Sequence, residues 1–221
     1  MNVSIFEALG PVMIGPSSSH TAGAARLGRI AALTVQGEFD HVDFALHGSF
    51  ARTYMGHGTD RALVAGVMGM HEDDDRLPNA FAIAASRGLS YTFCEEEMRD
   101  AHENTVRMTF RMTDGSIQTV TGSSIGGGQI VITSINGFDV EYTAQSNAIV
   151  IANYDRKGVI SHITGVLADH DINIGVMRLS RRARGEVACT IIEVDARIQP
   201  ELVEQIAAMP DVISARAINI Q

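Results

Sequence analysis

The spacing of apolar residues divides the chain into a helix-rich first part and a strand-rich remainder. Small and apolar residues at helical spacing predict three helices, at 21–36, 62–70 and 78–87. Alternation of apolar and polar residues predicts five strands, at 42–46, 106–112, 117–121, 130–135 and 138–142, with Asn136-Gly137 as a two-residue hairpin turn before the last. Helices followed by an antiparallel sheet are typical of the α+β class.

The last 75 residues have a second, more regular pattern. Strands are predicted at 148–152, 172–179, 186–194 and 212–220, with one helix over 158–170 and another starting at Pro200. The order βαββαβ is the ferredoxin-like arrangement. Residues 1–146 have a net charge of −8 and residues 147–221 of −1, and a short polar stretch at 145–147 separates them. We therefore predict two domains, 1–146 and 147–221.

The composition is that of a globular protein with an ordinary core. Of 221 residues, 45% are hydrophobic and 19% charged, which does not predict disorder. A net charge of −9 argues against nucleic acid or an anionic membrane as the main partner. We expect a soluble, cytoplasmic protein without a membrane segment, because no long apolar run and no basic, hydrophobic leader is evident.

Two scarcities restrict the chemistry. The chain has one lysine, Lys157, in a predicted surface turn. Because a pyridoxal-phosphate enzyme needs a Schiff-base lysine in its site, we expect no pyridoxal phosphate. The two cysteines, Cys94 and Cys189, form no Cys-x-x-Cys pair, so no cysteine-ligated cluster and no metal site is expected from this chain alone. Both are predicted to be small buried hydrophobes.

The most distinctive local feature is a serine-rich segment before the first helix. Ser17, Ser18, Ser19 and Thr21 place hydroxyls and free N–H groups at a helix start, where a carboxylate or phosphate can bind. His20 adds a group that titrates near neutrality. A plain serine N-cap is the commoner explanation of such a pattern.

A second cluster combines glycines with a histidine at 56–61. His57 is followed by Thr59 and Asp60, which are predicted to cap the next helix. Two helix starts that each carry a histidine could build one shared site. His47 could join them, although a histidine satisfied at a strand end is the simpler interpretation.

In the C-terminal part, the turn from the first strand to the first helix is the candidate binding loop. Asn153, Asp155 and Gly158 lie there, where the helix start could hold the carboxylate of a small effector. A simple strand-to-helix turn is the alternative.

The segments 10–23 and 56–63 resemble the beta chain of the bacterial iron–sulfur-dependent L-serine dehydratases. The C-terminal residues resemble an amino-acid-sensing ACT domain, with Asp155-x-x-Gly158 and the run 171–174 as matching motifs. Lys157 stands where this module commonly has proline. The resemblance implies an N-terminal α+β domain similar to the allosteric substrate-binding domain of phosphoglycerate dehydrogenase, followed by the ferredoxin-like ACT domain.

The resemblance also implies a reaction and its partners. L-serine would be deaminated to pyruvate and ammonia, with a 4Fe–4S cluster held by cysteines of a separate alpha chain. By motif position, His20 and His57 would be catalytic, and Ser17, Ser18, Ser19, Thr21, Thr59 and Asp60 would bind substrate. Asn153, Asp155 and Gly158 would bind an effector, and ACT domains would associate side by side in a homodimer. The alternative is a regulatory protein that senses an amino acid without catalysis.

Overall fold

The computed structural model describes residues 17–220 of the chain. The chain divides into two compact units, Met1–Thr133 and Ser134–Gln221, which are described one at a time below. The sequence predicts a domain boundary after residue 146 instead of after Thr133, and this boundary remains a prediction. Among the described residues, no helix is long and apolar enough to cross a membrane.

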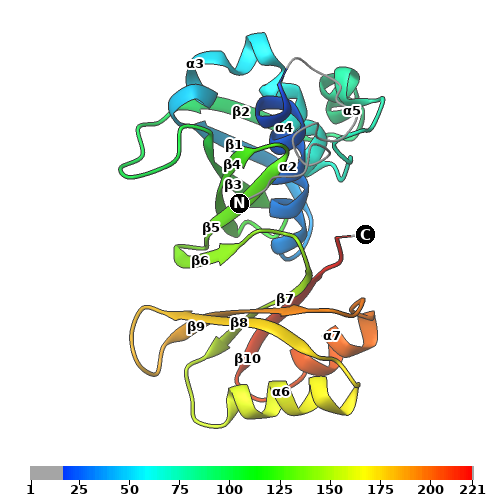
Figure 1. The fold of residues 1–221 in the computed structure, drawn as a ribbon, viewed down its shortest axis with the longest axis vertical. Helices are drawn as coiled ribbons and strands as arrows, with labels where there is room; N and C mark the ends of the chain where they lie inside the picture. Colours follow the sequence, from blue (N-terminus) through cyan, green and yellow to red (C-terminus); the bar gives the residue numbers. More distant parts are fainter. Residues whose placement is uncertain (1–16, 221) are drawn as a thin grey trace, which may run out of the picture. The chain divides into compact units, whose positions relative to one another are not determined.

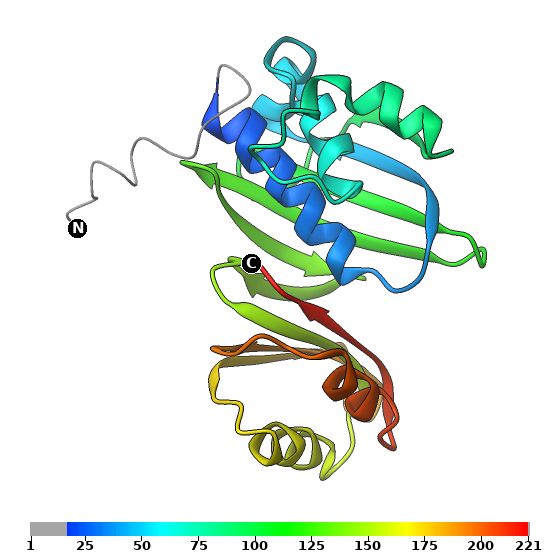
Figure 2. The same ribbon diagram turned by 90° about the vertical axis from the view of Figure 1, so that its right-hand side faces the viewer.

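The first unit combines a sheet with helices that cover one of its faces (Figures 1 and 2). Its helices are a π-helical turn η1 (Ser18–Ala22), α2 (Gly23–Thr34), α3 (Gly48–His57), α4 (Thr59–Val67), the 3₁₀ turn η2 (Leu77–Asn79) and α5 (Ala80–Ser86). Its strands are β1 (Phe39–Leu46), β2 (Ser90–Glu95), β3 (Thr105–Met112), β4 (Ile117–Gly126) and β5 (Gln129–Ile135). Within this unit the strand order is β2-β1-β3-β4-β5, and the next strand along the chain, β6 (Phe138–Tyr142), belongs to the second unit.

Strand alternation determines which face the helices cover. Val42, Phe44 and Leu46 of β1 are fully buried, whereas Asp43 between them is bound by Arg111 on the other face. Alternate residues of a strand point to opposite sides, so one face of the sheet is apolar and the other polar. The apolar face therefore requires a cover, and α2 lies across it (Figure 2).

Two glycines allow α2 and α4 to pack in backbone contact. A Cβ atom at Gly66 would lie 2.1 Å from the Ala25 carbonyl oxygen, and one at Gly28 would lie 2.6 Å from that of Leu63. Only glycine permits so close an approach. Thr21 contacts His57 at one end of the pair, and Gly28 faces Val67 further along. The two helices therefore run in the same direction.

The second unit has the βαββαβ order that the sequence predicts. Its elements are β7 (Asn147–Tyr154), α6 (Val159–Asp169), β8 (Ile174–Arg181), β9 (Val187–Val194), α7 (Pro200–Ala207) and β10 (Val212–Ile218). The four strands form an antiparallel sheet in the order β10-β7-β9-β8. Ile163 and Leu167 of α6 and Leu202 and Ile206 of α7 are buried in one apolar cluster with the sheet. The predicted α+β class and the ferredoxin-like second domain are confirmed.

Several local predictions are wrong or incomplete. The sequence pattern predicts neither α3 nor β2, which the structure adds to the first unit. Cys94 is exposed on β2 and not buried as predicted, because β2 is the edge strand of its sheet. Cys189 is buried as predicted, and burial raises the pKa of its thiol to about 11. Asn136-Gly137 forms the predicted hairpin turn, with φ of 50° and 75°.

The glycine contact predicts the stability of a matched pair of variants. Gly66→Ala forces the Ala25 backbone away and should lower the free energy of unfolding by about 3 kcal/mol. Gly56→Ala in α3 meets no atom within 4 Å and should leave stability unchanged or raise it by up to about 1 kcal/mol. Urea unfolding followed by circular dichroism measures both. Equal effects of the two substitutions would contradict the backbone contact.

Candidate functional site

His20 is held by two serine hydroxyls, one from each side of its ring. Its Nδ1 lies 3.2 Å from Ser17 Oγ, and its Nε2 lies 3.1 Å from Ser49 Oγ. Ser17 also caps the π-helical turn, because its Oγ accepts the His20 N–H at 3.4 Å. Ser49 belongs to the first turn of α3. The imidazole is therefore fixed in orientation by groups from two helix starts.

His57 meets His20 edge to face. The two ring centroids are 4.8 Å apart with an interplanar angle of 83°, and Phe50 contacts the His20 ring at 5.4 Å. The buried Thr21 hydroxyl donates to the His57 carbonyl oxygen at 3.2 Å and fixes the end of α3. His57 Nδ1 is buried and has no hydrogen-bond partner among the described residues.

The surroundings of His20 favour its neutral form. Burial lowers the pKa of His20, and the neighbouring His57 lowers it further. A cation in this place would lose hydration and face a second imidazole. At neutral pH His20 is therefore a neutral imidazole that can accept a proton or a hydrogen bond.

Further buried polar atoms near the starts of α2 and α4 have no hydrogen-bond partner among residues 17–220. Thr59, which follows His57 closely in sequence, is fully buried with an unpaired Oγ1. Ser124 Oγ is also buried and unpaired, and it lies beside the first residue of α2, since a Cβ at Gly23 would stand 2.0 Å from it. Buried polar groups are nearly always hydrogen-bonded in folded proteins. Such a group of exceptions marks a place where a ligand can supply the missing partners.

Asp60 is half-buried at the start of α4. Its Oδ1 accepts the Arg61 N–H at 2.8 Å, and burial raises the pKa of its carboxyl group. The half-buried Tyr91 lies close enough for Asp60 to raise the pKa of its hydroxyl in addition to the effect of burial. Asp60 thus faces the β2 side of α4.

The structure corrects the two predicted helix starts. His57 is the last residue of α3 and does not begin a helix, because Gly58, at a φ of +72°, ends α3 and precedes α4. Thr59 and Asp60 are the first residues of α4 and cap no N–H of a later turn. Ser18 and Ser19 lie half-buried inside η1, so Ser17 alone is the cap.

His47 does not join the histidine pair. His47 is the N-cap residue of α3. Its Nδ1 accepts the Met98 N–H at 3.1 Å, as expected for a satisfied histidine. Ser49 and Phe50, which do contact His20, were not predicted as site residues. The motif His47-Gly48-Ser49 is the sequence signal for these two contacts with His20. It can be interpreted only when α3, which the sequence does not predict, is known. Residues 10–16 of the first motif lie outside the described residues.

The candidate loop of the second unit is largely occupied by its own contacts. The Asp155 carboxylate binds Arg181 and accepts the Gly185 N–H at 3.2 Å. Asn153 is buried, and its Oδ1 accepts the Thr190 hydroxyl at 3.0 Å. Gly158 precedes α6 at a φ of +91°, and no side chain caps that helix. The start of α6 is therefore without a side-chain cap among the described residues, and the Val159 N–H donates to the Arg156 carbonyl oxygen at 3.5 Å.

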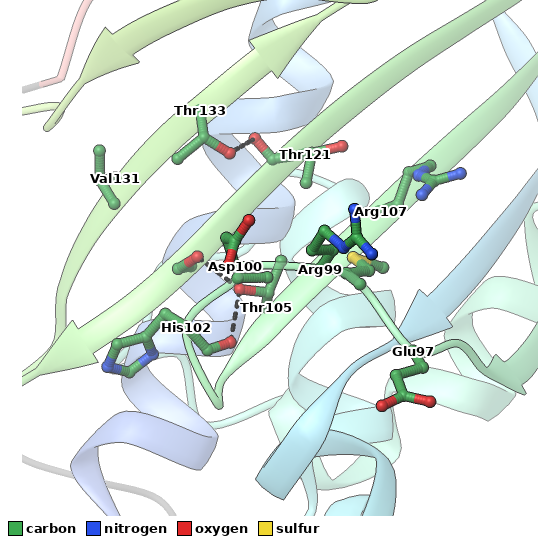
Figure 3. Close-up of a pocket in the computed structure, with 12 residues that line it drawn as sticks. Glu97, Arg99, Asp100, His102, Thr105, Arg107, Thr121, Val131 and Thr133 are labelled. Carbon is green, nitrogen blue, oxygen red and sulfur yellow. Dashed lines mark hydrogen bonds between the residues drawn. The ribbon is translucent and has the colours of Figure 1, made fainter.

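A separate cavity of about 520 Å³ lies on β3, β4 and β5 of the first unit, beside the segment 97–102 (Figure 3). Its wall carries hydroxyls and charges of both signs. Thr105 Oγ1 donates to the His102 carbonyl oxygen at 2.7 Å, and Thr133 Oγ1 donates to that of Thr121 at 3.3 Å. None of the predicted site residues lines this cavity.

The part of the chain that the structure describes contains no group of three side chains suited to bind a metal ion. An iron–sulfur cluster is held by four thiolates in the common case. The whole sequence has two cysteines, one on the exposed β2 and one buried in β9. The residues of this chain therefore do not fit such a cluster.

Comparison with known proteins agrees with this architecture. The family model of the serine dehydratase beta chain matches residues 4–90, and that of an AHAS small subunit-like ACT domain matches residues 149–214. A D-3-phosphoglycerate dehydrogenase of Bacillus subtilis (strain 168) is 25% identical over 89% of this chain and 37% of its own length. The protein is thus of the class that joins an α+β domain to a C-terminal ACT domain.

Two relatives match over almost their whole length. The "Probable L-serine dehydratase, beta chain" of Bacillus subtilis (strain 168) is 40% identical over 97% of both chains. The "L-serine dehydratase, beta chain" of Peptoniphilus asaccharolyticus is 37% identical over 98% of both chains. This chain belongs to the serine dehydratase beta chain family.

The lowered pKa of His20 predicts how the site responds to acid. Because the folded pKa is below the ordinary value of 6.5, the unfolded chain binds more protons between the two values, so this histidine makes folding less favourable as pH falls through that interval. NMR titration should give the His20 imidazole a pKa below 6.5, and the substitution His57→Gln should raise this pKa. A His20 pKa at or above 6.5, or one that does not change in the His57→Gln variant, would contradict the prediction.

Proposed function

We propose that this chain is the beta subunit of an enzyme that deaminates L-serine to pyruvate and ammonia together with a separate alpha chain. The two relatives that match over almost their whole length are named as L-serine dehydratase beta chains, which supports the reaction and the existence of a second chain. Because this chain has only two, separate cysteines, the ligands of the 4Fe–4S cluster in this proposal would belong to the alpha chain. The cluster would supply Lewis acidity for loss of the serine hydroxyl.

The observation that carries the proposal is the His20–His57 pair beside unpaired buried polar atoms. L-serine offers a carboxylate, an ammonium group and a hydroxyl, which can supply hydrogen-bond partners of both kinds. The N–H groups and hydroxyls at Ser17–Ser19 suit the carboxylate, since a helix start carries partial positive charge. Thr59, which follows His57 closely in sequence, supplies a buried hydroxyl.

His20 is suited to a proton step. The reaction removes the α-proton and the β-hydroxyl of serine as water, and the resulting aminoacrylate takes up one water to give pyruvate and ammonia. A neutral imidazole is required to accept a proton at neutral pH, and burial keeps His20 in that form. His57 Nδ1 can hold a substrate oxygen or relay the proton, whereas Thr21 positions His57 through its carbonyl.

For the second unit we propose an effector site and a homodimer contact. An effector carboxylate would bind the uncapped N–H groups at the start of α6, beside Asn153, Asp155 and Gly158. The homodimer would form along β8, which is an edge strand with three side chains about 40% exposed, Val176, Met177 and Leu179. Both features support a regulatory role of the ACT domain within the enzyme.

Anaerobic co-expression with an alpha chain tests the proposed function directly. We expect a brown, oxygen-sensitive complex that forms pyruvate from L-serine, whereas this chain alone forms none. Equilibrium binding of L-serine to the isolated chain provides the contrast. Tight binding without any lyase activity on mixing would refute the subunit proposal and favour an amino-acid-sensing regulatory protein.

The histidine pair makes a specific kinetic prediction for that complex. His20→Asn removes the proton acceptor and should lower kcat/KM by about 10²- to 10⁴-fold. His71→Gln is the matched control, because His71 is an exposed histidine of the same unit outside the pair. Pyruvate release under anaerobic conditions measures both. An unchanged kcat/KM for His20→Asn would remove His20 from the site.

A further inference from the structure

Three side chains on the polar face of the first sheet, opposite α2, form a chain of hydrogen bonds that ends at a serine hydroxyl (Figure 2). The ring of His41 on β1 contacts one partner with each nitrogen. Its Nδ1 lies 2.7 Å from Ser90 Oγ, and its Nε2 lies 2.8 Å from Asp43 Oδ1. Ser90 begins β2 and is paired with His41 in the parallel ladder, so both side chains lie on the same face.

The charge of Asp43 determines which nitrogen of a neutral His41 carries the proton. Burial raises the pKa of this carboxyl group, but hydrogen bonds from Thr92, His41 and Arg111 outweigh that effect and lower the pKa to about 2. Asp43 is therefore an anion at neutral pH. A neutral imidazole then donates its Nε2 proton to the carboxylate, and its Nδ1 is left as an acceptor that faces the Ser90 hydroxyl.

The Ser90 hydroxyl is placed to give its proton to His41. Its other acceptor, the Asp40 carbonyl oxygen, is farther away, at 3.1 Å. An imidazole that accepts a serine proton while a carboxylate holds its second nitrogen is the arrangement that activates serine nucleophiles. The nitrogens have exchanged partners relative to the serine proteases, in which Nε2 faces the serine, but either nitrogen of a neutral imidazole can accept a proton.

The serine is accessible, and there is space for a substrate nearby. Ser90 is exposed. A cavity of about 480 Å³ is bordered by Asp40 and Leu89, the residues directly before His41 and Ser90. A volume of this size is sufficient for a small organic molecule.

We propose that Ser90 is a nucleophile that accepts the acyl group of small activated carboxylic esters, with His41 as the general base and Asp43 as a positioning residue. Ser90 Oγ forms a bond to the ester carbonyl carbon while its proton moves to His41 Nδ1. The bond from that carbon to the leaving alcohol breaks, and His41 returns the proton to the alcohol oxygen. Water then attacks the acyl-serine in the same way, which releases the carboxylic acid and restores the hydroxyl. This activity is independent of L-serine deamination, because it uses neither histidine of the candidate site.

Acetylation of the full chain by p-nitrophenyl acetate tests the proposal. We expect a burst of p-nitrophenol stoichiometric with the chain, and peptide mass spectrometry should find the acetyl group on Ser90. Ser90→Ala should abolish the burst. Ser86→Ala is the matched control, because Ser86 is an exposed serine of the same unit whose hydroxyl donates to the Ile83 carbonyl oxygen at 2.7 Å. A native chain without a burst, or a burst that Ser90→Ala leaves unchanged, would overturn the proposal.

The roles of His41 and Asp43 have a separate test. His41→Gln should slow acetylation of Ser90 about 10²-fold. In ¹⁵N NMR a neutral His41 should carry its proton on Nε2, and Asp43→Asn should remove this preference and slow acetylation, which a merely structural role would not require. Arg111→Gln is the control, because it removes the ion pair with Asp43 and leaves the contact of Asp43 with His41. A proton on Nδ1 in the native chain, or equal slowing by Asp43→Asn and Arg111→Gln, would contradict the assigned roles.

Discussion

The geometry of the candidate site depends on one packing constraint, the backbone contact between α2 and α4 at Gly28 and Gly66. Because these helices run in the same direction, the segments that precede them end side by side. His20 lies just before α2, and His57 lies just before α4, so the helix crossing sets the 4.8 Å separation of their rings. Neither histidine could meet the other if larger side chains separated the helices.

The serine-rich and glycine-rich motifs could be found from the sequence because their chemistry is local. The partners of His20 could not be found in the same way. Ser49 and Phe50 depend on α3, a short helix with glycines near both ends and only two buried residues, Phe50 and Ala51. So weak an apolar stripe gives no clear helical period. The strand β2 was missed for a related reason, since an edge strand is partly exposed on both faces.

The second unit was predicted almost completely, and the reason is physical. Its strands β7 and β9 are buried nearly along their length, and α6 and α7 each present one apolar face to them. Local patterns of that strength can be recognised in the sequence. The contacts of Asp155 could not be predicted in this way, because Arg181 and Gly185 reach it only through the register of β8 and β9. A loop that looks free in sequence is therefore partly filled in the fold.

The unpaired polar atoms beside the histidines are the feature that packing alone does not explain. A buried donor or acceptor without a partner costs about 1–3 kcal/mol. Among the described residues, three such atoms, on His57, Thr59 and Ser124, have no hydrogen-bond partner. In the proposed function, the polar groups of L-serine supply these partners, which an apolar molecule could not do.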